Sequence, residues 1–160
     1  MKRRDFLAAA LAAGPAAAVA AGDDPKPKRS DKAVRVAVGD DRNGEKIVLP
    51  GGSPNACKVS AKDTDGAMSV FESTVTQKGG PPAHVHEDQD EWFHVLEGEF
   101  DFQVGEDRFK LKVGDSVLAP RKVAHAWASV GDKPGKLLIV FQPAGKMEAF
   151  FRALGEQKER

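Results

Sequence analysis

The chain has 160 residues with 24 basic and 24 acidic side chains, so its formal charge is zero. This length predicts one folded domain with short appendages, and the balanced charge argues against a protein that binds nucleic acid. The single cysteine, Cys57, excludes a disulfide framework and a zinc site built from cysteines.

The first residues have the pattern of an export signal. Arg3 and Arg4 precede an alanine-rich run, and residues 18–20 offer the small side chains of a cleavage site. The paired arginines resemble the twin-arginine signal, so we expect residues 1–21 to direct export by the twin-arginine machinery to the periplasm or beyond. The alternative is an uncleaved amphipathic helix. Because Cys57 lies far downstream, we expect no lipid anchor, and no apolar run in the body of the chain predicts a membrane-spanning helix.

The remainder divides into a linker, a β domain and a terminal helix. Residues 22–32 are charged, contain proline and predict a disordered linker. From residue 33, short β-branched and aromatic runs alternate with glycine and proline turns, which is typical of an all-β sandwich or barrel over residues 33–143. The candidate strands are residues 34–38, 46–49, 58–61, 68–76, 92–96, 100–104, 109–113, 116–119, 126–130 and 137–142.

Residues 144–160 show a different period. Apolar residues recur with helical spacing at Met147, Phe150, Phe151 and Leu154. This pattern predicts an amphipathic helix that Gly155 could end, with Glu148 and Arg152 paired one turn apart. We expect the helix to pack on the β domain, and the alternative is that its apolar face docks a partner.

Three histidines and one acid carry the strongest chemical signal. His84 and His86 are two residues apart, so in an extended strand both imidazoles point to the same side. Glu91 begins the next predicted strand, and His125 begins a later one. Three imidazoles and a carboxylate suit a divalent transition metal, and octahedral coordination by four protein ligands would leave two positions open. The fourth histidine, His94, is predicted to lie on the opposite strand face and to be structural or at an interface, and not a ligand.

These residues stand in an order that resembles the cupin family. His84-Val85-His86, Glu91 and Gly98 are similar to the first cupin motif, and Gly114, Pro120 and His125 are similar to the second. Over residues 66–143 the resemblance implies a small jelly-roll (double-stranded β-helix) barrel. It also implies one metal with these ligands: His84, His86, Glu91 and His125.

Three positions depart from the cupin pattern. The leading glycine of the first motif corresponds to Gly79 or Gly80, closer to the histidines than is usual. Lys122 stands where the second motif has glycine, and Ser129 stands where asparagine is common. These departures affect the loop before His125 and one neighbouring polar position, but they remove none of the four ligands.

Strand alternation also predicts a substrate pocket. Phe93 and Val95 share a face with Glu91, while Trp127 and Ser129 share a face with His125. We therefore expect these four side chains to line an apolar pocket for a small molecule, the alternative being that the aromatic rings belong to the core. No lysine or arginine is predicted to point inward on these strands, which favours a neutral or aromatic ligand.

The resemblance is greatest to the small single-domain (type 2) cupins related to quercetin dioxygenases. It implies a dioxygenase for a small aromatic or enolic substrate, with Glu91 as a ligand or as a general base. The alternatives are a binding module without turnover and a metal-dependent isomerase or lyase. Fe(II) or Mn(II) is favoured because twin-arginine substrates fold before export, with Ni, Cu and Zn as alternatives. A homodimer is also implied.

Overall fold

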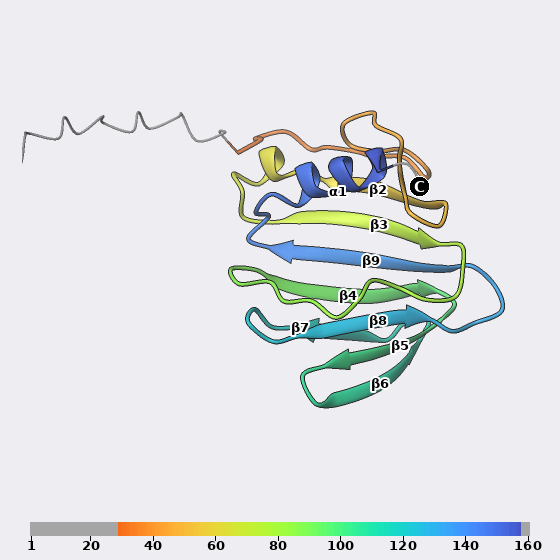
Figure 1. Ribbon diagram of the computed structural model, residues 1–160. Coiled ribbons are helices and arrows are strands. Elements are labelled where there is room, and N and C mark those ends of the chain that lie inside the picture. Colours follow the sequence, from red (N-terminus) through yellow and green to blue (C-terminus); the bar gives the residue numbers. More distant parts are fainter. Residues whose placement is uncertain (1–28, 158–160) are drawn as a thin grey trace, which may run out of the picture.

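The computed structural model describes residues 29–157, which form two facing antiparallel sheets and a C-terminal helix (Figure 1). The larger sheet has the strand order β1-β2-β3-β9-β4-β7, and the smaller sheet has the order β6-β5-β8. The predicted export signal and residues 22–28 of the predicted linker lie outside the described residues. Within the described part of the chain, no helix is long and apolar enough to cross a membrane.

The element bounds confirm an all-β jelly roll with one C-terminal helix, although among residues 29–157 no hydrogen-bonded ladder closes the two sheets into a barrel. The strands and helices are β1 Ile47–Leu49, β2 Ser53–Val59, the 3₁₀ helix η1 Ala61–Asp63, β3 Ser69–Val75, β4 Asp90–Glu97, β5 Glu99–Val104, β6 Asp107–Lys112, β7 Ser116–Ala119, β8 His125–Ser129, β9 Gly135–Gln142 and α1 Met147–Glu156.

Two strand predictions are wrong. Residues 34–38 alternate like a strand, but they pair with no strand in the described part of the chain and end in a turn, so they are irregular. The strand predicted at residues 58–61 is β2, which begins at Ser53 and ends at Val59. Pro54 and Asn55 have low strand propensity, yet the register of β2 between β1 and β3 holds them in the sheet, which is an override of propensity by tertiary pairing.

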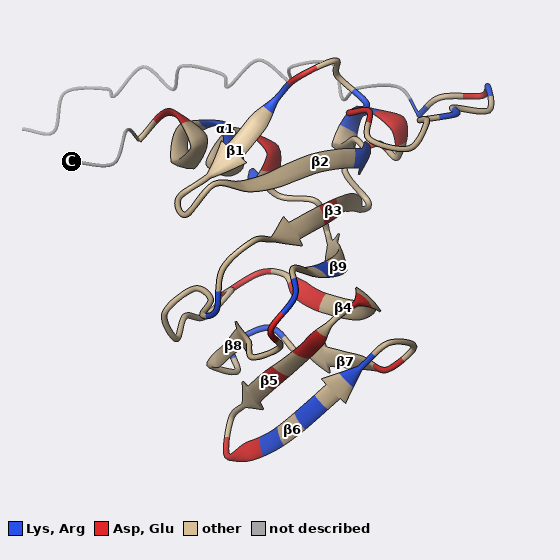
Figure 2. Cartoon of the chain, turned by 90° about the vertical axis from the view of Figure 1, so that its right-hand side faces the viewer, with Lys and Arg blue, Asp and Glu red and all other residues tan. Residues whose placement is uncertain are grey.

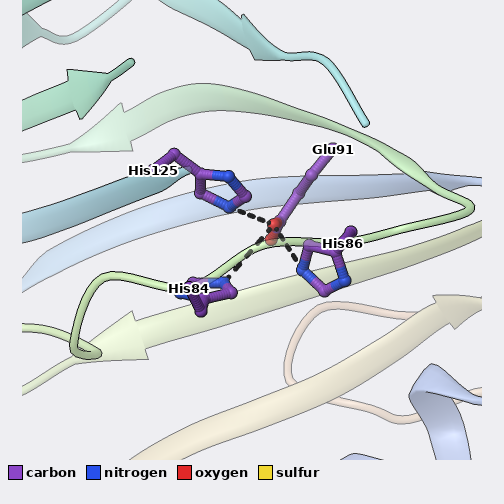
Figure 3. A group of neighbouring side chains, drawn as sticks. All are labelled: His84, His86, Glu91 and His125. Carbon is purple, nitrogen blue, oxygen red and sulfur yellow. Dashed lines mark hydrogen bonds and ion pairs between the residues drawn. The ribbon is translucent and has the colours of Figure 1, made fainter. Parts of the chain in front are cut away.

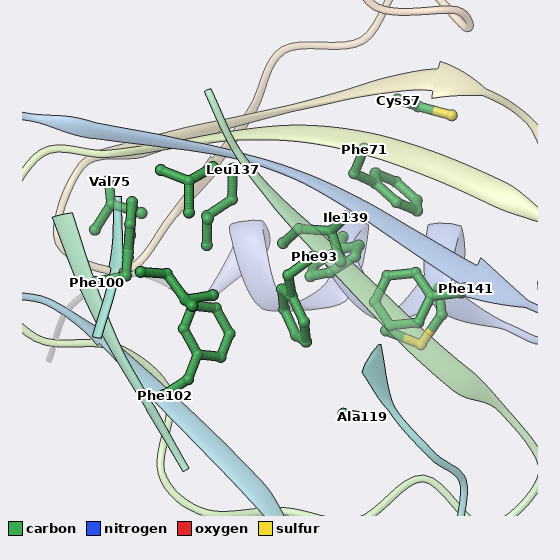
Figure 4. Packing of buried hydrophobic residues seen from close by; sticks show 14 residues of the cluster. Cys57, Phe71, Val75, Phe93, Phe100, Phe102, Ala119, Leu137, Ile139 and Phe141 are labelled. Carbon is green, nitrogen blue, oxygen red and sulfur yellow. The ribbon is translucent and has the colours of Figure 1, made fainter. Parts of the chain in front are cut away.

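The core lies between the two sheets (Figure 4). In β4 every second side chain is buried, because the odd-numbered residues face the smaller sheet. Phe93 from the larger sheet meets Phe102 from the smaller one in an edge-to-face contact, with ring centroids 5.0 Å apart. This contact fixes the distance between the sheets next to the histidine cluster.

Helix α1 packs beside β1 and over the edge of the larger sheet (Figure 1). Phe151 is buried, and its ring centroid lies 4.7 Å from that of Phe71 on β3. The Glu148 carboxylate accepts hydrogen bonds from the Ser60 hydroxyl and the Ala61 amide, at 2.9 and 2.7 Å. The predicted pair with Arg152 forms at 3.5 Å. The helix ends one residue after Gly155, at Glu156.

The smaller sheet is protected by charge at its edge strand, β6. Figure 2 shows lysine and arginine in β6 beside acidic residues in β5. Lys110 is paired in register with Asp101, and Lys112 with Glu99. Lysines on an edge strand disfavour pairing with another chain.

Candidate metal centre

The segment that carries His84 and His86 runs beside β8 without forming a continuous strand. The expectation that both histidines lie in an extended strand is therefore wrong. It is joined to β8 by two isolated bridges, Gly79 with Ser129 and His84 with His125. The His84 amide donates to the His125 carbonyl at 3.0 Å, and the His125 amide donates back at 2.9 Å. Between the bridges, Pro81 and Pro82 have no N–H to donate, which interrupts the ladder.

Both glycines before this segment are required by its geometry. Gly79 has a φ of +112°, a region that other residues rarely adopt. Gly80 lies so close to β8 that a Cβ there would be 1.9 Å from the carbonyl oxygen of Trp127. The sequence left open whether Gly79 or Gly80 corresponds to the leading glycine of the first motif. The structure requires glycine at both positions.

All three imidazoles converge on one carboxylate oxygen (Figure 3). The Oε2 atom of Glu91 lies 2.8 Å from His125 Nε2, 3.0 Å from His86 Nε2 and 3.9 Å from His84 Nε2. One ligand atom from each of the four residues lies within 4.8 Å of all the others. Metal bonds of about 2.0–2.2 Å place neighbouring ligand atoms about 3 Å apart, so this spacing fits a single ion.

Backbone carbonyls set the tautomer of two of the histidines. His84 Nδ1 lies 2.9 Å from the Pro82 oxygen, and His125 Nδ1 lies 3.3 Å from the Val123 oxygen. A carbonyl can only accept, so each Nδ1 carries the proton. In the neutral form of each ring, Nε2 then carries the lone pair that a metal needs.

Interactions within the cluster stabilise the charged forms of Glu91 and His125, although both side chains are buried. Burial by itself raises the pKa of Glu91, but hydrogen bonds from His125 and His86 outweigh it and hold the pKa below its usual range. Burial likewise lowers the pKa of His125, but Glu91 outweighs that effect and raises it. A divalent cation would displace the imidazole protons and take their place beside the carboxylate.

Comparison with known families agrees with this geometry. The family profile described as "Cupin domain" matches residues 71–141, which contain all four candidate ligands. Residues 71–141 are thus similar to a cupin domain. An uncharacterized protein from Methanocaldococcus jannaschii is 30% identical over 76 residues, covering 48% of this chain and 61% of that protein. The match thus spans less than two thirds of that relative's length.

Solved structures share the fold of this domain. KdgF from Halomonas sp. has a TM-score of 0.58 at 15% identity, covering 66% of this chain and 94% of that chain. An RmlC-like cupin from Shewanella frigidimarina has a TM-score of 0.57 at 22% identity, covering 65% and 87%. Identities this low show a common fold and no more. The geometry of the histidine–glutamate cluster and the family match support a site that could hold a metal, as in cupins.

The loops that carry the candidate ligands are tied to one another. Arg121 Nη2 pairs with the Asp90 carboxylate at 2.6 Å, which joins the start of β4 to the loop before β8. Hydrogen bonds from the Arg121 side chain and amide lower the pKa of Asp90 to about 2. Gln89, between ligands His86 and Glu91, donates from Nε2 to the carbonyls of residues 143 and 144 just before α1.

A cavity of about 860 Å³ opens on the candidate metal centre, with His84, His86 and Glu91 in its wall. Of the predicted pocket residues, Trp127 lines this cavity. Phe93 and Val95 are fully buried in the core, and the buried Ser129 bonds through its backbone to Gly79. The inner face of β4 points between the sheets, so Glu91 is the residue of that strand that reaches the cavity wall.

Sequence reasoning missed the other walls. Phe141 and Ile139 from β9 line the cavity, as do four apolar side chains of α1 and two lysines, Lys78 and Lys146. Residues 137–141 are all apolar, so the sequence did not show which of them face inward; in the structure burial alternates along β9, and Ile139 and Phe141 face inward. That β9 lies next to β4, with Phe141 opposite Glu91, is a fact of topology that spacing along the chain does not contain.

Two other reactive side chains lie away from the cluster. His94 is on the opposite face of β4 from Glu91 and stacks on Trp92, with ring centroids 5.6 Å apart. Cys57 is buried on the inner face of β2. Burial, with smaller effects from Glu148 and Asp41, raises the pKa of its thiol to about 12, which makes it a packed side chain rather than a nucleophile.

Proposed function

We propose that this domain is a metal-dependent dioxygenase of the quercetin-dioxygenase-like type that acts on a small aromatic or enolic substrate. The observation that carries the proposal is the convergence of three imidazole Nε2 atoms on Glu91 at the wall of a largely apolar cavity. Iron(II) or manganese(II) held by His84, His86, Glu91 and His125 would supply a Lewis acid and redox chemistry with dioxygen.

The chain's own groups support this use of the site. The backbone carbonyls behind His84 and His125 hold both rings in place before any substrate arrives. Trp127, Ile139 and Phe141 make the cavity wall next to the ligands apolar. Hydrogen bonds from His125 and His86 outweigh burial and hold the pKa of Glu91 below its usual range, so its carboxylate is charged and can help to hold a cation.

The test is oxygen uptake by protein loaded with Fe(II) or Mn(II), using a panel of catechols and flavonols. Uptake that requires metal and is lost in His86→Ala, but not in His94→Ala, would support the proposal. Turnover without oxygen consumption would replace it with an isomerase or lyase. Binding without any turnover across the panel would replace it with a non-catalytic binding module.

We further propose that the domain works after export, supported by Arg3-Arg4 and the alanine-rich run that follows them. A cupin that folds before export takes its metal in the cytoplasm, which favours iron or manganese over the tighter-binding copper and zinc. Cell fractionation of an Arg3→Lys, Arg4→Lys double variant tests the route, and retention in the cytoplasm is expected. Stoichiometric copper or zinc in protein from the native compartment would contradict the metal assignment.

A further inference from the structure

Helix α1 forms one wall of the cavity beside the candidate metal centre. Its side chains on that wall are Met147, Phe150, Phe151 and Leu154. Met147 and Phe151 are buried, whereas Phe150 is 52% exposed. The Phe150 ring lies against Phe151, with centroids 5.4 Å apart. The helix thus presents a half-exposed aromatic ring to the cavity, and an apolar ligand would cover it.

The remaining walls are also aromatic and aliphatic. Trp127 reaches the cavity from β8, and its ring is held by Phe100, with centroids 5.8 Å apart. Ile139 and Phe141 reach it from β9. A cavity of about 860 Å³ falls in the usual range for ligands with one to a few rings. Walls of this kind favour a rigid apolar body.

One positive charge on the cavity wall, that of Lys146, is not paired with an acid among the described residues. Among the described residues that line the cavity, Glu91 is the one acid, and it belongs to the histidine cluster. Lys78 is neutralised by Asp132, with Nζ 2.7 Å from Oδ1. Lys146 also lines the cavity, and it has no ion pair or side-chain hydrogen bond within residues 29–157. It stands at the N-terminal end of α1, where the helix dipole adds positive potential.

From these walls we propose that the cavity binds an aromatic carboxylate. Its ring system would lie against Phe150 and Trp127, and its carboxylate would pair with Lys146. Lys146 and Phe150 are then the residues that set specificity, the first by charge and the second by apolar contact. The inference rests on the proposed function because the same cavity would hold its substrate, but binding can be measured without metal or oxygen.

The two tryptophans of the chain provide a direct assay. Trp127 lines the cavity, whereas Trp92 lies on the outer face of β4. In Trp92→Phe, the remaining tryptophan, Trp127, reports on the cavity alone. We would titrate this variant, as purified and after chelation, with a nitronaphthoate, whose nitro group quenches indole fluorescence on contact. The matching nitronaphthyl alcohol is the neutral probe, and Trp127→Phe corrects for absorption by the probes.

The expected result is saturable quenching of Trp127, with the acid bound about fivefold more tightly than the alcohol, as for a partly exposed ion pair. Lys146→Gln should remove that preference and leave the affinity for the alcohol unchanged. Phe150→Ala should weaken both probes about tenfold. Lys133→Gln, which removes an exposed lysine outside the cavity wall, is the matched control and should change neither affinity.

Absence of saturable quenching by either probe would overturn the proposal, as would equal binding of acid and alcohol in the Trp92→Phe protein. Calorimetric titration of the unsubstituted chain with both probes gives the same comparison if Trp92→Phe folds poorly. Because binding needs no metal, binding of the acid by the chelated protein together with no oxygen uptake by the metal-loaded protein would refute the dioxygenase and leave this inference standing. Oxygen uptake by the metal-loaded protein, with no preference for acids in the titrations, would support the dioxygenase and refute this inference.

Discussion

The backbone amide of Lys122 donates a hydrogen bond to the carbonyl of His86 at 2.8 Å, while Lys122 itself has a left-handed φ of 66°. This bond ties the loop before His125 to the segment that carries His86, so it connects the two ligand-bearing parts of the chain. The left-handed conformation is costly for a residue with a Cβ and free for glycine. Lys122 is also the position where the sequence departs from the glycine of the cupin motif.

Lys122→Gly should therefore stabilise the fold by about 0.5–1 kcal/mol, because relief of the strained backbone outweighs the added freedom of the unfolded chain. Urea unfolding at neutral pH measures the change. Lys122→Ala is the matched control, since it removes the same side chain but keeps the Cβ, and it should not stabilise. If alanine and glycine stabilise equally, the lysine side chain rather than its backbone conformation is the source of the effect.

The ligand set makes a second prediction. Glu91→Gln keeps the shape of the side chain but removes the charge that faces three imidazoles, and His86→Ala removes one nitrogen ligand. Each should lower the affinity for Fe(II) or Mn(II) by about a hundredfold or more, since even groups that only support ligands contribute tenfold to a hundredfold. Competition with a chromophoric chelator measures the affinity. His94→Ala should bind as the unsubstituted protein does, and equal binding by all four proteins would refute the ligand assignment.

The close approach of Gly80 to β8 leads to a third prediction. A methyl group at Gly80 would meet the Trp127 carbonyl, which is backbone and cannot turn away. Gly80→Ala should cost about 2–3 kcal/mol of unfolding free energy and weaken metal binding by displacing His84. Gly131→Ala is the control, because the nearest atom to its added Cβ lies 3.7 Å away. Similar losses in both variants would show that the close approach at Gly80 is not special.

Much of this fold could be predicted because its signals are local. The alternation of Phe100 and Phe102, the turn at Gly105 and the helical period after Met147 each depend on neighbours within a few residues. The ligand set was also predictable, because His84 and His86 share a side through spacing alone and the motif supplies the order of the others. The pairing of strands with one another is not a local property. Residues 34–38 have the alternation of a strand, but no strand of the described residues pairs with them.

The cavity could not be predicted for the same reason. Strand alternation placed Phe93 and Val95 on the same face as Glu91 correctly, but it could not say that this face passes from the cavity into the core within one strand. Nor could the apolar spacing of α1 distinguish a cavity-lining side chain that is buried against the sheet, such as Phe151, from one that stays half exposed, such as Phe150. Only the packing of α1 against β1 and the larger sheet separates these roles.

The buried thiol makes a fourth prediction. Cys57 is 2% exposed, and its pKa is raised to about 12, chiefly by burial. At mildly alkaline pH it should stay a thiol and react with a disulfide reagent at least a hundredfold more slowly in the folded protein than in urea, since the reagent reaches it only when the structure opens. Absorbance of the released thiolate follows the reaction. Rapid, complete labelling of the folded protein would show that Cys57 is accessible.

The last prediction concerns stability against acid. Asp63 ends η1 and accepts hydrogen bonds from Arg42 Nη2 at 2.7 Å, Arg42 Nε at 2.9 Å and the Ser60 amide at 3.0 Å. Burial by itself raises the pKa of this carboxyl, but Arg42 and then Ser60 outweigh burial and hold it below its usual range. Protonation of Asp63 therefore begins at a higher pH in the unfolded chain than in the folded one.

The stability from Asp63 is accordingly present above the unfolded pKa of about 3.9 and is lost as the pH falls through the lower folded pKa. Asp63→Asn should unfold at a lower temperature than the unsubstituted protein at neutral pH, and the difference should shrink as the pH falls below about 4. Calorimetric melting at a series of pH values measures it. Asp65→Asn, at an exposed position two residues away, should melt like the unsubstituted protein throughout. A constant difference between Asp63→Asn and the unsubstituted protein at every pH would mean that the carboxyl contributes through its shape and not through its charge.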